Sequence, residues 1–130
     1  MTLDHAIYKL ISSDASLQAV ITSMSTQVGS RALGELLPQI RYIRISSPAS
    51  DDTPQRWERW RFFVRAEKYA TVETIKDLLY NVFQNGGGTV TDGAESLDID
   101  FTTAVDFGRS PEVVDDAYES YIDFRVTWRV

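Results

Sequence analysis

The apolar and polar positions of the first twenty residues follow a helical period. In residues 3–11 apolar side chains recur three and four positions apart, which predicts an amphipathic helix. Thr2 is placed to cap this helix, and Asp14 is placed to cap a second, short one over residues 15–21. The chain therefore begins with two helices that each present one apolar side.

The clearest helical pattern lies in the middle of the chain, over residues 71–85. Thr71 is expected to cap this helix, and the three glycines at 86–88 are expected to end it. The apolar positions form one stripe, which predicts that a single side of the helix packs on the core. The residues of the stripe are Val72, Ile75, Leu79, Val82 and Phe83, with Leu78 beside them.

Four other segments alternate with the period of a β-strand. They are residues 39–46, 57–68, 97–101 and 118–130, and a weaker pattern allows a short strand at 27–31. The last segment alternates almost without a break, so we expect a long strand that is buried on one side. Because it ends at the chain terminus, we also expect it at a sheet edge, where it would be free to pair with another chain.

The predicted order is helix, short helix, strand, strand, helix, strand, strand. Antiparallel hairpins with helices on one face satisfy this order. We therefore predict the α+β class, with a mainly antiparallel sheet of about four or five strands and helices packed on one face. A length of 130 residues fits one domain, 1–130, and residues 47–55 and 108–116 are expected to be loops.

Composition and charge narrow the function further. The chain has no cysteine, which excludes thiol chemistry, and no apolar run of the roughly 20 residues that span a membrane. The N-terminus does not resemble a secretory signal. The formal net charge is −6, which argues against general nucleic-acid binding. Residues 1–68 carry nine bases and seven acids, whereas residues 69–130 carry four and twelve. The acids either solvate exposed faces or steer copies toward one another.

Candidate catalytic groups are few. His5 is the only histidine, sits at a polar helix position and is expected to face solvent. No nucleophile elbow is present, and the glycines at 86–88 follow a helix where a phosphate loop would precede one. Asp98 and Asp100 share a strand face, but their spacing matches no calcium loop. We expect no catalytic residue, no cofactor and no metal site.

One strand interleaves arginines with aromatic residues. Arg59, Arg61 and Arg65 fall on one face of it, whereas Trp60 falls on the face expected to meet the core. Such a face binds single-stranded nucleic acid in some proteins, pairs with neighbouring carboxylates in others, or forms a protein interface, for which arginine is a usual anchor. We favour a core position for Trp60 and an interface role for part of the arginine face.

In order and composition the chain resembles the tail terminator, or tail completion, proteins of long-tailed bacteriophages. The resemblance rests on LDHAIYKLISSDASLQAVI at the N-terminus and on GSRALGELLPQIRYIRISS after it. It continues in RWRFFVRAEKYATVETIKDLLYNVF and in the closing strand YIDFRVTWR, and so spans most of the chain. It is a likeness of pattern over a long stretch rather than one diagnostic motif.

The resemblance implies a structural virion protein without substrate or cofactor. Such proteins form hexameric rings that cap the tail tube, end tail growth and meet the head-completion or connector proteins. The implied partners are other copies of this chain, the tail tube protein and the connector, with genomic DNA passing through the lumen without specific binding and no membrane. The implied location is the virion tail or neck, after assembly in the host cytoplasm.

Within that family, particular residues gain expected roles. The loop at 47–55, with Ser50, Asp51 and Asp52, would be an arm that orders on docking to the tail tube. Asp98 and Asp100 would line the lumen and repel passing DNA. Arg59, Arg61 and Arg65 would contact another subunit.

Three alternatives remain open. A head-closure or connector protein of the phage neck makes similar demands on the sequence. A small soluble ligand-binding module, with a pocket between sheet and helices, belongs to a different class. An enzyme is the third and would need a site built from carboxylates alone.

Overall fold

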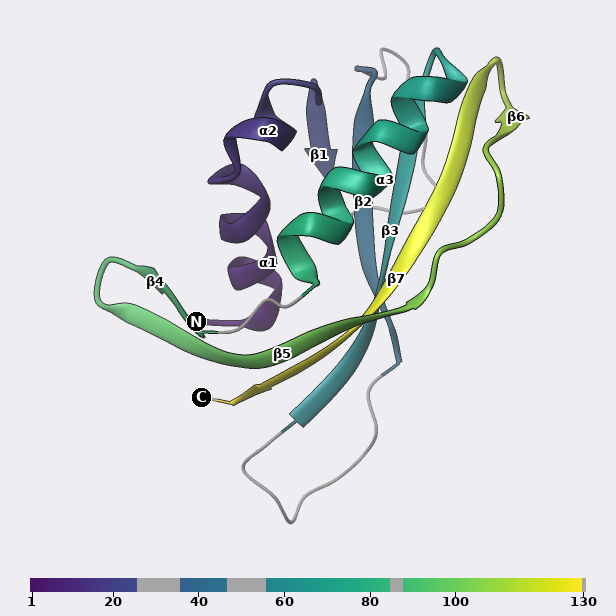
Figure 1. Cartoon of the computed structure of the whole chain (residues 1–130). Coiled ribbons are helices and arrows are strands. Elements are labelled where there is room, and N and C mark those ends of the chain that lie inside the picture. Colours follow the sequence, from purple (N-terminus) through teal and green to yellow (C-terminus); the bar gives the residue numbers. More distant parts are fainter. Residues whose placement is uncertain (26–35, 47–55, 85–87, 130) are drawn as a thin grey trace.

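The chain forms a strongly twisted β-sheet with its helices gathered on one face (Figure 1). In this computed structural model, residues 1–25, 36–46, 56–84 and 88–129 are described. The helices are α1 (Leu3–Ser12), α2 (Ala15–Gln18) and α3 (Tyr69–Phe83). The strands are β1 (Ser23–Ser25), β2 (Gln39–Ser46), β3 (Arg56–Ala66), β4 (Gly88–Asp92), β5 (Glu95–Asp106), β6 (Glu112–Val114) and β7 (Ala117–Arg129).

The strands follow the order β1-β2-β3-β7-β5-β4, and β6 pairs with β7 beside this row. The pairing of β1 with β2 is parallel, and every other described pairing is antiparallel. β3 and β7 pair along the whole of β3, from Arg56 opposite Trp128 to Ala66 opposite Tyr118. These two long strands form the centre of the sheet.

The predicted fold class was wrong. The sheet has seven strands rather than four or five, which makes the protein β-rich rather than α+β. The strands that the sequence did not reveal are β1, β4 and β6, of three to five residues each. Segments this short show no alternation and are held by backbone hydrogen bonds to their neighbours. β6 lies inside the segment 108–116 that was predicted to be a loop, and the suggested strand at 27–31 lies outside the described residues.

The position predicted for the last strand was also wrong. β7 lies between β3 and β5, so it is a central strand and not an edge. Alternation shows which side chains face the core, but it does not show which strands lie on either side. Burial on the other face of β7 is what indicates its central position, because Asp123 and Thr127 are buried there as well. A strand that is buried on both faces usually lies inside a sheet.

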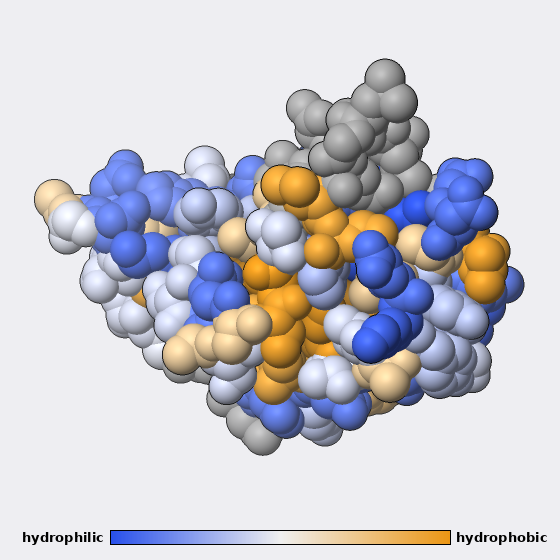
Figure 2. All heavy atoms as spheres, turned by 90° about the horizontal axis from the view of Figure 1, so that it is seen from above, coloured by the Kyte–Doolittle hydropathy of each residue, from blue (hydrophilic) through white to orange (hydrophobic). Residues whose placement is uncertain are grey.

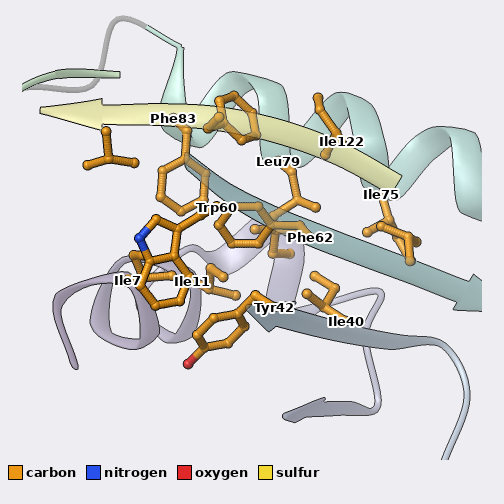
Figure 3. Close-up of a cluster of buried hydrophobic side chains, with 14 of the residues drawn as sticks. Ile7, Ile11, Ile40, Tyr42, Trp60, Phe62, Ile75, Leu79, Phe83 and Ile122 are labelled. Carbon is orange, nitrogen blue, oxygen red and sulfur yellow. The ribbon is translucent and has the colours of Figure 1, made fainter. Parts of the chain in front are cut away.

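The core fills the space between the helices and the sheet (Figure 3). Phe62 of β3 lies at its centre, with its ring centroid 5.0 Å from that of Phe83 on α3 and 5.7 Å from that of Phe124 on β7. Tyr42 of β2 stacks on Phe62 at 5.8 Å, and burial raises the pKa of its phenol. Trp60 is also buried here, at the position predicted for it.

The ends of the helices test the predicted caps. Thr2 accepts a hydrogen bond from the His5 amide at 3.2 Å, and Asp14 accepts one from the Leu17 amide at 2.9 Å, so both N-terminal caps are confirmed. The predicted cap Thr71 was wrong, because α3 begins after Lys68, which makes no side-chain capping bond. α3 ends at Phe83, before the glycines, and no helix among the described residues is long and apolar enough to cross a membrane.

Candidate functional site

A cluster of charged groups lies on the face of the sheet opposite the helices. Asp123 of β7 is 0% exposed and accepts hydrogen bonds from two arginines of β3. Arg59 approaches it with Nε at 2.9 Å and Nη2 at 2.6 Å, and Arg61 with Nε at 2.8 Å and Nη2 at 3.0 Å. Asp106 of β5 adds a carboxylate 3.7 Å from Arg59. The alternation of β3 and its register with β7 bring these groups together.

Aromatic rings complete this cluster. The guanidinium carbon of Arg61 lies 4.1 Å from the ring centre of Tyr121, and that of Arg125 lies 4.4 Å from the ring centre of Trp57. Both contacts fit cation–π interactions. The hydrogen bonds to Asp123 raise the pKa of Arg61, so this arginine stays charged. We call these groups the outer cluster; it consists of Trp57, Arg59, Arg61, Phe63, Asp106, Tyr121, Asp123 and Arg125.

Arg65 lies apart from the outer cluster. It is only 3% exposed and donates to the carbonyl oxygens of Val114 and, at 2.7 Å, Asp115, with Glu119 3.5 Å away. Asp115 and Asp116 have φ angles of 48° and 67°, as the two-residue turn of a tight hairpin requires. The structure thus places Arg65 under the β6–β7 hairpin, where it holds the turn, and not on an open surface.

Of the predicted acidic residues, Asp98 is the one whose side chain the structure describes. Asp98 of β5 accepts a hydrogen bond from the Thr89 hydroxyl at 2.7 Å, and β7 separates it from the arginines of β3. The side chain of Asp100 lies outside the described part of the structure, as do all of Ser50, Asp51 and Asp52. Asp98 is therefore not brought together with the predicted basic residues within one chain.

His5 was predicted to face solvent, but its ring also contacts a strand. Its Nε2 lies 2.8 Å from Asp92 of β4, and Lys9 lies 3.6 Å from the same carboxylate. The hydrogen bond from His5 and the charge of Lys9 lower the pKa of Asp92. This pair joins α1 to the β4–β5 hairpin. Among the residues that the structure describes, no three metal-ligating side chains lie close enough to hold an ion.

An open hollow of about 640 Å³ lies where α1 begins, and no sequence pattern predicted it. Its apolar wall includes Ile43, Trp60 and Trp128. At its polar end Glu58 accepts hydrogen bonds from Trp60 Nε1 at 3.1 Å and from Arg44 at 3.2 Å. The indole nitrogen of Trp128 is buried without a hydrogen-bond partner among the described residues. The hollow needs residues from four separate segments, which explains why spacing alone did not reveal it.

Large apolar side chains are also exposed at several surface positions. Seen from above, apolar residues gather in a strip across the middle of the molecule with hydrophilic residues on both sides (Figure 2). Apolar surface of this kind is typical of contacts with other proteins. The exposed large apolar residues of the described chain are Tyr8, Leu36, Ile43, Ile45, Tyr69, Val105, Phe107 and Val113.

Comparison with known proteins finds a likeness in fold. No protein-family model matches the chain, and no curated protein matches it by sequence. The chain is similar in structure to a chain in the virion of a native gene transfer agent particle, with a TM-score of 0.69. The likeness covers 98% of this chain and 95% of that one, at 15% sequence identity. At this identity the likeness shows a shared fold over the full length of both chains.

Proposed function

We propose that this chain is a structural protein of a phage-like virion and, within it, the tail terminator. It would form a ring on the tail tube, end tail growth and join the tail to the head-completion or connector protein. The observation that carries this proposal is the fold, which the chain shares from end to end with a component of a gene transfer agent virion. The resemblance of the sequence to the terminator family, in the order of its predicted elements and in composition, adds support.

The described surface suits a protein that works by contact. Its charged groups are paired with one another in the outer cluster and in the His5–Asp92 pair, and no described group combines a nucleophile with a base. Aromatic residues and arginines on the outer face are the side chains that most often anchor protein interfaces. A ring requires two unlike patches that fit each other, which a surface of uneven charge provides.

The test is a particle assembled without this protein. A terminator sets tail length, so its loss is expected to give tails of uncontrolled length that remain separate from heads, as seen by electron microscopy. Adding the purified protein back is expected to restore one length. A connector protein of the neck would instead leave tails of normal length that fail to join, and that result would reject the terminator role.

The hollow beside α1 supports a second candidate, a small ligand-binding module. Its wall includes the rings of Trp60 and Trp128, with Glu58 at the polar end, which suits a small aromatic ligand. This role predicts saturable quenching of tryptophan fluorescence by a set of indole and phenol fragments, with loss of the response in Trp128→Phe. Two results together would reject this candidate: tails of normal length when Trp128→Phe replaces the wild type, and no fragment binding by the wild-type protein.

A further inference from the structure

The two lateral halves of the sheet carry opposite charge. β2 and β3 together contain six arginines and one glutamate, a formal charge of +5. β4 and β5 contain five acids and no base, a formal charge of −5. The strand between the halves, β7, has two acids and two arginines and is neutral. Charge therefore changes sign across the sheet, from the β2 side to the β4 side.

Each half also ends in an edge that lacks a strand partner among the described residues. β1 covers β2 only from Gln39 to Arg41, so residues 42–46 have no strand from the described part of the chain on that side. Ile45 is 44% exposed there, and Ile43 is exposed beside it. At the other end β4 pairs with β5 alone, and Thr89 and Thr91 are exposed. Unpaired backbone groups at such edges readily accept another strand.

We infer that copies of this chain associate head to tail, with the β2 edge of one copy against the β4 edge of the next. This inference rests on the proposed function, and it names the two surfaces that would meet in the proposed ring. The partner is a second copy because one chain supplies both edges, and the halves of the sheet behind them carry formal charges that are equal in size and opposite in sign. Unlike edges at opposite ends of the sheet give a heterologous contact, which closes a ring when the rotation between copies allows it.

The direction of the strands fits this contact. Four successive antiparallel pairings, from β2 through β3, β7 and β5 to β4, give β4 the same sense as β2 within the sheet, although the twist turns the two strands across each other in space (Figure 1). A rotation between copies that compensates for this twist would let the edges meet in parallel, as β1 and β2 do within one chain. The sheet would continue from one copy into the next.

Side chains at the two edges match on both faces. On the helix side Arg44, which bonds Glu58 but keeps its side chain 58% exposed, would meet Glu95 of the next copy. Glu95 lies 3.9 Å from the N-terminal ammonium and is 60% exposed, so it can reach a second cation. On the outer side Ile43 and Ile45 would lie beside the threonines of β4. Charged pairs at the rim set the register, and the apolar contact excludes water.

Reciprocal charge changes at exposed edge positions test the inference. Ile45→Glu places an acid on the β2 edge, and Thr91→Lys places a base on the β4 edge, so each single variant buries a charge against an uncharged partner. Each is expected to weaken self-association about tenfold or more, because a charge that loses water without gaining a partner is costly. The double variant places the two opposite charges against each other and is expected to recover most of the loss. Native mass spectrometry and sedimentation over a concentration series measure the association.

Matched controls carry the same charge changes away from both edges. They are Tyr69→Glu and Thr74→Lys, at exposed positions of α3, and both are expected to associate like the wild type. Circular dichroism confirms that every variant is folded. Association that Ile45→Glu and Thr91→Lys leave unchanged would overturn the edge assignment but not the terminator role. A wild type that controls tail length yet never self-associates would also overturn it, whereas failure to control tail length would reject the proposed function itself.

Discussion

The two faces of the sheet both bury side chains, but by different means. The face toward the helices is filled with apolar and aromatic side chains around Phe62, as Figure 3 shows. The opposite face buries Asp123 beneath the guanidinium groups of two arginines, and it buries Arg65 beneath the β6–β7 hairpin. The first face gains free energy from removal of apolar area, whereas the second depends on every charge finding its partner.

This difference decides how each face responds to change. An apolar core loses packing in proportion to the volume that a substitution removes. A buried ion cluster loses most when one member is removed, because the remaining charges stay behind without partners. The neighbouring residues Phe62 and Phe63, which point to opposite faces of β3, allow a direct comparison.

The largest effect is expected from Phe62→Ala. Phe62 is 0% exposed and contacts three other aromatic rings, so its loss leaves a cavity worth about 3–5 kcal/mol of unfolding free energy. Phe63→Ala on the outer face is the control and is expected to cost about 1 kcal/mol, the size of one aromatic pair. Urea denaturation measures both. Equal losses would contradict the distinction between the faces.

Asp123→Ala should have the next largest effect. It removes the acceptor of four hydrogen bonds and leaves Arg59 and Arg61 facing each other, at an expected cost of about 2–3 kcal/mol. Because both arginines are partly exposed, solvent screens part of the penalty. Asp98→Ala, which removes one exposed hydrogen bond, should cost less than about 0.5 kcal/mol. A stable Asp123→Ala protein would show that the cluster contributes little to folding.

A smaller loss of unfolding free energy is expected from substitution of Gly108. Its φ angle is 68°, and a Cβ there would overlap the carbonyl oxygen of Tyr121. Gly93 has a similar φ angle of 63° but open space around it. Gly93→Ala is expected to cost about 1 kcal/mol for the backbone alone and Gly108→Ala about 2 kcal/mol, as thermal unfolding would show. Identical losses would mean that the close approach is relieved without cost.

The smallest effect concerns the surface pair that joins α1 to β4. The pKa of Asp92 is lower in the folded chain than in the unfolded chain, so the pair stabilises the fold above the unfolded pKa of about 3.9. This stabilisation is lost as the pH falls through the folded pKa. Asp92→Asn is therefore expected to be slightly less stable than the wild type at pH 7 and equal to it near pH 2. A difference that persists at low pH would assign the effect to packing.

The helix-facing side of the sheet was largely predictable from the sequence. Periods of two and of 3.6 residues placed β2, β3, β7, α1 and α3 and put Trp60 in the core. The short strands were not predictable, since β1, β4 and β6 depend on neighbours that lie elsewhere in the chain. The strand count and the central place of β7 were missed for that reason.

The outer face was predictable only in part. The arginines of β3 were singled out and their pairing with neighbouring carboxylates was foreseen as one reading, but their partner, Asp123, was not identified. Pairing across strands depends on register, which alternation leaves undetermined. Arg65 looked the same as Arg59 and Arg61 in the sequence, yet the β6–β7 hairpin covers it. The charge difference between the halves of the chain was visible in the sequence. The strand order, which was not, places the basic and the acidic strands in opposite halves of the sheet.

The measurement that tests the central claim most directly is the mass of the wild-type assembly by native mass spectrometry, alone and on isolated tail tubes. The account predicts a closed ring, hexameric by resemblance to the terminator family, whose stability falls as salt screens the contact between unlike edges. A protein that remains monomeric at every concentration, and also when tail tubes are present, would contradict it.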